Sequence, residues 1–154
     1  RIQCYTTETV GTAAWHHVAL TYDGSVSSAG VAFYIDGTAS TVTQQFNSLV
    51  GSTVSNTNLK LGMNISLGSL IDPVLGYINE VAIFNAALSA GNITTIYNAG
   101  HTGDISAMSN LVSWYRFETA LTPADDATTI YDRKGSDNGT GVSLVSGDFS
   151  TDVP

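Results

Sequence analysis

The carboxylates are the first residues in this 154-residue chain whose chemistry can be judged from their spacing. A retaining glycoside hydrolase needs two carboxyl groups about 5 Å apart, and an inward-facing strand supplies such a pair at alternating positions. The glutamates are Glu8, Glu80 and Glu118, which lie far apart in the sequence. Glu80 lies among apolar residues and is interpreted as a structural carboxylate that accepts hydrogen bonds. The sequence therefore predicts that the protein is not an enzyme.

Histidine and cysteine patterns give no second route to catalysis. His16 and His17 are adjacent, so on a strand their side chains point to opposite faces and cannot bind one ion together. No spacing indicates a Ser-His-Asp or Cys-His arrangement, and the sequence has no glycine-rich phosphate loop. Cys4 is the only cysteine, so the chain has no internal disulfide and the fold must be held by burial of its core.

Calcium is the one cofactor that the loop residues support, because it binds carboxylate, amide and carbonyl oxygens. The candidate ligands are loop residues with such side chains: Asp23, Asp36, Asp72, Asp132, Asp137 and Asn138. Asp23 and Asp36 each precede a glycine, and turn formation alone explains that pairing. Arg133 and Lys134 lower the cation affinity of segment 132–138. These residues can be interpreted either as calcium ligands or as solvated turn residues, and the second interpretation is favoured.

Exposed aromatic rings beside amides and carboxylates are typical of sugar-binding sites. Tyr5, Tyr77 and Tyr131 are the candidates for such a ring if their faces are exposed. A half-buried strand position is the competing interpretation for each of the three. The aromatic residues expected in the core are Trp15, Tyr34, Phe84 and Trp114.

The composition narrows the class of partner. Thirteen acidic and five basic residues give a formal net charge of -8, which repels phosphate backbones and anionic lipids, so we expect no nucleic-acid binding. No apolar run is long enough to span a bilayer, so we expect no membrane insertion. Only 12% of the residues are charged and Ser, Thr, Asn and Gly are abundant, which is typical of extracellular and virion-surface β proteins.

The elements that must position these residues are strands with tight turns. Segment 17–22 alternates in polarity, which places Val18, Leu20 and Tyr22 on one face that we expect to be core. Segment 31–35 alternates in the same way, and each of the two strands ends at an Asp-Gly pair that favours a reversal. The remaining expected elements are a return strand at 38–46, a strand at 59–62, a loop at 64–73, a strand at 76–84 and a strand at 111–118.

One helix of about two turns is predicted between Ser89 and Gly100. Ser89 is a suitable N-cap, and Gly100 lies where a helix stop belongs. Ile93, Ile96 and Tyr97 fall at helical spacing, which indicates one buried face.

Two motifs carry a resemblance to a known family. Trp15 to Gly24, followed by Phe33 to Gly37, resembles the centre of laminin-G-like, concanavalin A-like domains. Segments 76–89 and 93–100 are similar to the closing strand and helix of that family. The resemblance implies an all-β fold, a two-sheet antiparallel jelly-roll sandwich with one short helix. It also implies that calcium can be held at the rim of the sandwich.

The order of the segments departs from that family. Leu111 to Glu118, followed by 130–140, resembles the opening of a laminin-G-like domain, yet it comes after the segments that it should precede. We therefore expect a laminin-G-like core over 1–100, a linker over 101–110 and a β segment over 111–154. That last segment either completes the same sandwich, as a permuted domain, or begins a second repeat. A similar arrangement occurs in tail, fibre and virion-surface proteins of marine bacteriophages.

These observations favour a non-catalytic adhesion or structural module, located outside a cell or on a virion surface. Its expected partners are a glycan or protein receptor, or neighbouring subunits of an assembly. A calcium-dependent carbohydrate-binding lectin is the alternative, and a glycan hydrolase is the least favoured function because the sequence has no carboxylate pair.

Overall fold

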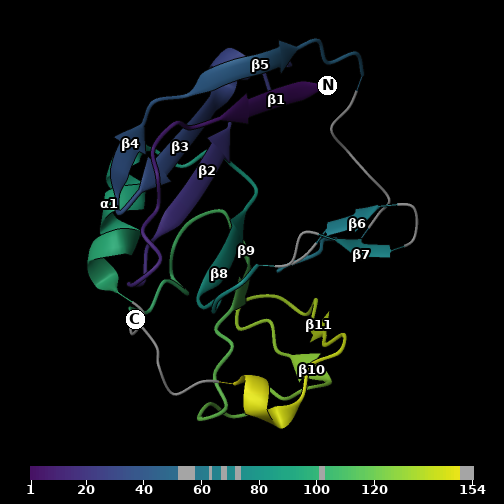
Figure 1. Cartoon of the computed structure of the whole chain (residues 1–154). Helices are drawn as coiled ribbons and strands as arrows, with labels where there is room; N and C mark the ends of the chain where they lie inside the picture. Colours follow the sequence, from purple (N-terminus) through teal and green to yellow (C-terminus); the bar gives the residue numbers. More distant parts are fainter. Residues whose placement is uncertain (52–57, 63, 67–68, 72–73, 101–102, 150–154) are drawn as a thin grey trace.

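The computed structural model describes residues 1–51, 58–62, 64–66, 69–71, 74–100 and 103–149, which form a strand-rich chain with one α-helix (Figure 1). The strands are β1 (Ile2–Tyr5), β2 (Val18–Tyr22), β3 (Val31–Ile35), β4 (Thr38–Ser40), β5 (Thr43–Asn47), β6 (Asn64–Ser66), β7 (Ser69–Ile71), β8 (Val81–Phe84), β9 (Leu111–Tyr115), β10 (Thr129–Ile130) and β11 (Gly139–Thr140). The helices are α1 (Ala90–Ala99) and the 3₁₀ turns η1 (Ser28–Gly30) and η2 (Ser146–Asp148). Within these residues no helix is long and apolar enough to cross a membrane.

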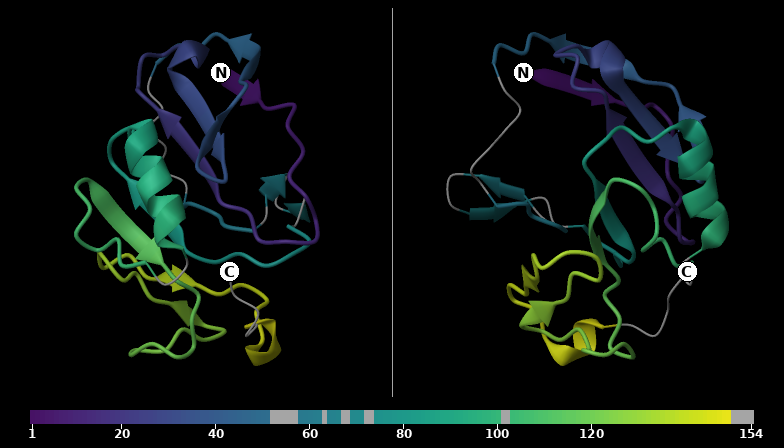
Figure 2. Two further views of the ribbon diagram at one scale, coloured as in Figure 1. Left: turned by 90° about the vertical axis from the view of Figure 1, so that its left-hand side faces the viewer. Right: turned by 180° about the vertical axis from the view of Figure 1, so that it is seen from behind.

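The strands pair in small antiparallel sheets. β2, β3 and β4 form a three-stranded sheet, and the other described strands pair as β1–β5, β6–β7, β8–β9 and β10–β11. Both views in Figure 2 place β8 and β9 between the β2–β3–β4 sheet and the C-terminal part that contains β10 and β11. The chain therefore consists mostly of strands in several small sheets.

The predicted turn at Asp36-Gly37 joins β3 to β4. Ile35 faces Thr38 across the ladder, so the two residues between them form a two-residue hairpin loop. Both have positive φ, +50° at Asp36 and +73° at Gly37, as this tight loop requires. A Cβ on Gly37 would lie 2.8 Å from Cδ1 of Tyr97, so the turn is also in close contact with α1.

α1 confirms the predicted helix, and its ten residues make nearly three turns. The Ser89 hydroxyl accepts a hydrogen bond from the Asn92 backbone N–H, and Gly100 ends the helix with φ +65°. Ile93 is buried, whereas Tyr97 is 42% exposed. The Thr94 hydroxyl donates to the Gly37 carbonyl, which joins the helix to the β3–β4 turn.

The apolar core is built around the pairing of β8 with β9. Ile105, Leu111 and Trp114 are buried together and pack against half-buried side chains that include Phe84 and Ile96. Ala82 lies opposite Trp114 in the ladder. A strand from the C-terminal third of the chain thus buries its tryptophan against a strand that precedes the helix.

A buried carboxylate organises the segment after β9. Asp125 has a fully buried side chain and accepts hydrogen bonds from the backbone N–H groups of Glu118 and Tyr131. The Arg133 guanidinium also donates to it, at 2.8 Å from Nη2 to Oδ1. Because every partner is supplied from within the segment, the charge is paired and its desolvation is compensated.

Several predicted boundaries are wrong. The loop expected at 64–73 contains the paired strands β6 and β7, and residues 59–62 form no strand. The strand expected at 76–84 begins only at Val81, because Glu80 has φ +54° and interrupts the extended backbone. The return strand expected at 38–46 is split into β4 and β5.

Candidate functional site

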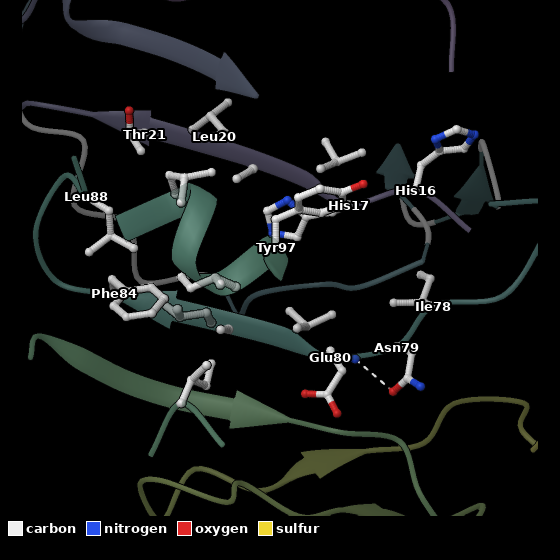
Figure 3. Close-up of a pocket in the computed structure, with 18 of the residues that line it drawn as sticks. His16, His17, Leu20, Thr21, Ile78, Asn79, Glu80, Phe84, Leu88 and Tyr97 are labelled. Carbon is white, nitrogen blue, oxygen red and sulfur yellow. Dashed lines mark hydrogen bonds between the residues drawn. The ribbon is translucent and has the colours of Figure 1, made fainter. Parts of the chain in front are cut away.

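A cleft of about 1060 Å³ lies between β2 and β8, with α1 at its back (Figure 3). This volume slightly exceeds the range of about 300–1,000 Å³ that is typical of small-molecule sites. Its apolar part is lined by side chains from all three elements, including Leu20, Phe84 and Ile93. His16, Ile78 and Asn79 lie at one end in Figure 3, which we call the polar end.

Val18 and Leu20 are 61% and 60% exposed, which corrects the expectation that this face of β2 is core. Exposure alternates at the start of the strand, where Ala19 is half-buried between the exposed Val18 and Leu20. Both residues border the cleft and not a packed layer of side chains, and so do their neighbours on the other face of β2. An open apolar wall of this kind is a mark of a binding surface.

Two buried nitrogen atoms at the polar end have no hydrogen-bond partner among the described residues. They are Nδ1 of His17 and the side-chain amide nitrogen of Asn79. Asn79 is held in place because its Oδ1 accepts a hydrogen bond from the Glu80 backbone N–H at 2.8 Å. Buried polar atoms are nearly always paired, but three further unpartnered ones lie elsewhere in the described residues, so these two do not by themselves mark a binding site.

His17 is kept neutral by its surroundings. Burial lowers the pKa of His17, and the negative charge of Asp36 opposes that shift only partly. Its ring packs against that of Tyr97 with the centroids 5.9 Å apart, and the two side chains face each other in the cleft (Figure 3). A neutral imidazole can donate or accept a hydrogen bond, which suits a hydroxyl group.

An aromatic pair, next in sequence to His16 and Ile78 of the polar end, also lines the cleft. The rings of Trp15 and Tyr77 lie 6.3 Å apart with an interplanar angle of 32°, and Tyr77 is 61% exposed. Beside them His16 Nδ1 donates to Asp36 Oδ2 at 2.8 Å, and the His17 backbone N–H donates to Asp36 Oδ1 at 3.0 Å. The hydrogen bond from His16, with that from His17, lowers the pKa of Asp36.

Glu80 borders the cleft, but its carboxylate turns away toward β9. Oε2 accepts from Trp114 Nε1 at 2.6 Å, and Oε1 accepts from Arg116 Nε at 2.7 Å. Burial raises the pKa of Glu80, against the opposing effects of Arg116 and Trp114. The same guanidinium donates to Glu118 at 2.9 Å, so two glutamates that are distant in sequence share one arginine.

The three candidate tyrosines lie in different places. Tyr77 lines the cleft, whereas Tyr5 is on β1 with 47% of its surface exposed and does not line the cleft. Tyr131 follows β10 and is half-buried, with the Arg133 guanidinium 5.5 Å from its ring centroid. The structure therefore brings only Tyr77 together with other polar and aromatic groups of the cleft.

The candidate calcium ligands lie at separate places. Asp23 and Asp36 follow β2 and β3 at opposite ends of an antiparallel pair. Hydrogen bonds from the Ser25 side chain and from the Ser25 backbone N–H lower the pKa of Asp23. Asp72 lies outside the described residues. No group of three or more His, Cys, Asp or Glu side chains in the described part of the chain could hold a metal ion.

Asp132, Asp137 and Asn138 belong to one loop, in which Asp132 Oδ1 has several internal partners while its buried Oδ2 has none among the described residues. Asp132 Oδ1 accepts from the backbone N–H groups of Trp114, Lys134 and Gly135. Burial opposes its charge, but these hydrogen bonds prevail and lower the pKa of Asp132. Asn138 Oδ1 accepts from the Asp132 N–H, and the Asp137 carbonyl accepts from the Tyr115 hydroxyl. This arrangement stabilises a loop beside β9.

Sequence reasoning missed Asn79 and Tyr97 as cleft residues. Asn79 is a short amide residue next to Glu80, and Tyr97 belongs to the helix pattern, so neither suggests a place in a cleft. The available signal is spacing: Tyr77 and Asn79 are two residues apart and precede a strand, so they can face one side together.

These features define a strand-rich domain with a ligand-sized cleft and an aromatic, polar end. Residues 1–94 match the laminin G profile of the concanavalin A-like lectin/glucanases superfamily. This match covers more than half of the chain, which therefore belongs to that family. No curated protein and no solved structure matches the chain.

Proposed function

We propose that this chain is a non-catalytic adhesion module that binds a glycan or a glycan-bearing receptor in the cleft between β2 and β8. Its family fold is then the two-sheet antiparallel jelly-roll sandwich. Its setting is extracellular or on a virion surface, as in phage tail and fibre proteins, where it also packs against neighbouring subunits. The low content of charged residues supports this setting.

The polar end of the cleft carries the proposal. Tyr77 is exposed and lies beside Trp15, so its ring offers an apolar face to the C–H side of a sugar ring, and the polar groups of this end can bond to sugar hydroxyls. The cleft is large enough for one or two sugar units.

The arrangement of the glutamates supports a role without hydrolysis. Glu80 and Glu118 both bind Arg116, and Glu118 is not among the residues that line the cleft. A general acid must release its proton to the substrate oxygen, and a nucleophile must reach the sugar carbon. The oxygens of Glu80 instead accept hydrogen bonds from Trp114 and Arg116.

A glycan array probed with the full chain tests this function, with and without EDTA. We expect binding to a subset of neutral glycans, unchanged by EDTA; binding that disappears with EDTA would instead support the calcium-dependent lectin. The Tyr77→Ala variant should lose at least tenfold in affinity for the selected glycan by calorimetry. Tyr5→Ala is the matched control, because Tyr5 is an exposed tyrosine outside the cleft. No binding in either condition, or equal losses in both variants, contradicts the proposal.

A further inference from the structure

The cleft lies between the edges of two strands and not between their faces. Neighbouring residues of a strand point to opposite faces, so a face that borders a cleft supplies only alternate residues to its lining. Here every residue of β2 and every residue of β8 lines the cleft. Among the described strands, β2 pairs only with β3 and β8 pairs only with β9. Both strands therefore turn an unpaired edge toward the cleft.

The hydrogen bonds at the ends of β2 show which of its backbone groups face the cleft. At one end the Asp36 N–H donates to the His17 carbonyl, and at the other the Asp23 N–H donates to the Gly30 carbonyl. Hydrogen-bonded positions alternate in an antiparallel ladder, so the odd-numbered residues of β2 bond to β3. The N–H and C=O groups of the even-numbered residues point away from β3, and no described residue bonds to them. These residues are Val18, Leu20 and Tyr22.

β8 offers similar groups on its own side of the cleft. Trp114 of β9 lies opposite Ala82 in the ladder. The Trp114 N–H donates to the Asp132 side chain, and the Trp114 carbonyl accepts from the Arg133 N–H, so neither group bonds to β8. The N–H and C=O of Ala82 therefore point away from β9, and no described residue bonds to them. Each wall of the cleft thus carries unpaired backbone donors and acceptors.

The two strands run in the same direction along the cleft. In Figure 3 His17 lies to the right of Leu20. In the same view Glu80 lies to the right of Phe84. Neighbouring strands of an antiparallel sheet alternate in direction, so the two strands on either side of any one strand run the same way. One extended strand between β2 and β8, antiparallel to both, would therefore bond to both edges and link the β8–β9 pair to the β2–β3–β4 sheet.

The lining of the cleft indicates which kind of strand fits. Ile93 and Ile96 of α1 line the back of the cleft, so alternate side chains of an inserted strand would meet an apolar surface. Glu80 is the only Asp, Glu, Lys or Arg among the described residues that line the cleft, and its carboxylate turns toward β9. The formal net charge of -8 disfavours an acidic segment. The segment that fits is neutral or basic and has apolar side chains at alternate positions.

We propose that the receptor bound by this module places an extended segment of its own polypeptide between β2 and β8, antiparallel to both strands. Its sugar then lies at the polar end of the same cleft. About five residues match the length of β2 and span roughly 17 Å. This inference deepens the proposed function and rests on it, because the segment and the sugar share one cleft. It differs from the addition of a strand to a single edge, because the backbone of the segment is bonded on both sides.

N-methyl scanning of a bound peptide tests the pairing. The probes are nonapeptides without sugar, with alternating apolar and polar residues, selected from a display library against the full chain and measured by calorimetry. Adjacent residues of an inserted strand point their N–H groups to opposite edges. N-methylation at either of two neighbouring central residues should therefore weaken binding at least tenfold. A strand added to one edge would lose affinity at only one of the two positions, and a peptide held by its side chains at neither.

Either of those two results overturns the proposal. A library that yields no binder also overturns it, including the case in which the chain dimerises and a second copy fills the cleft. Because the peptides carry no sugar, a failed library and a failed glycan array are separate results.

Amide hydrogen exchange, followed by NMR, locates the bound segment. Peptide binding should slow the exchange of the Leu20 and Ala82 N–H groups at least tenfold. Ala19 and Val81 are the matched controls, because their N–H groups already bond to β3 and β9 and should change little. Slowing at Leu20 alone would mean pairing with one edge only, which contradicts the insertion.

Two substitutions at position 20 separate the backbone from the side chain. Leu20→Pro removes the N–H that faces the cleft and leaves the ladder with β3, as proline at an edge strand does. Leu20→Ala keeps this N–H and removes most of the side chain. We expect Leu20→Pro to bind the peptide at least tenfold more weakly than Leu20→Ala, with the circular dichroism of both variants unchanged. Equal affinities in the two variants overturn the pairing with β2.

Discussion

Replacing Gly37 by alanine separates two costs that the structure combines at the β3–β4 turn. Gly37 has φ +73°, and a non-glycine residue in this region costs about 1–2 kcal/mol. The new Cβ would also lie 2.8 Å from Cδ1 and 3.2 Å from Cβ of Tyr97, so the helix side chain must move. Such overpacking costs a further ~1–3 kcal/mol. We therefore expect Gly37→Ala to lower the free energy of unfolding by about 2–5 kcal/mol.

Gly24→Ala is the matched control for this substitution. Gly24 has φ +80°, and a Cβ added there would meet nothing within 4 Å, so only the backbone cost of about 1–2 kcal/mol applies. Urea denaturation followed by circular dichroism measures both losses. A double-mutant cycle with Tyr97→Ala should remove most of the steric part from Gly37→Ala, since only the Cβ of residue 97 remains close, and leave Gly24→Ala unchanged. Equal losses in the two glycine variants would refute the proposed contact between the turn and α1.

Three further perturbations test the electrostatics and the helix cap. Burial lowers the pKa of His17 below its unfolded value, so the unfolded chain binds more protons than the folded one. The free energy of unfolding should therefore fall as the pH drops below about 6.5. The His17→Asn variant should show a flatter pH dependence in denaturation curves taken from pH 7 to 5. Asp125→Ala should destabilise the chain by about 3–5 kcal/mol in urea, because it leaves the Arg133 guanidinium half-buried without its carboxylate; a loss below 1 kcal/mol would contradict that pairing. Ser89→Ala should cost about 1 kcal/mol and Ser89→Asp little, measured by thermal melting, since an aspartate still accepts the Asn92 N–H.

The parts of the fold that depend on local signals could be predicted from the sequence. The Asp36-Gly37 turn, the strands on either side of it and the capped helix each follow from a few neighbouring residues. Polarity could not reveal the break at Glu80, because a positive φ in an apolar run depends on Asn79, Trp114 and Arg116, which hold the backbone and side chain in place.

In the candidate site, too, residue types could be predicted from the sequence whereas long-range contacts could not. Tyr77 could be named from its residue type, but its neighbour Trp15 lies far away in sequence and joins it only in the folded chain. The expectation that Glu80 is a structural carboxylate agrees with its hydrogen bonds to Trp114 and Arg116. The sharing of Arg116 with Glu118 could not be foreseen, because sequence distance says nothing about which partners a guanidinium will find.

The pairing of β8 with β9 extends the folded core beyond the part of the chain that matches the family profile. The stretch recognisable by descent ends at residue 94, inside α1, while the tryptophan that closes the core is Trp114 on β9. A recombination event that moved only the recognisable stretch would carry away half of a helix and leave β8 without its partner. A fragment that ended at residue 94 would therefore lack both the strand that pairs with β8 and the tryptophan of the core.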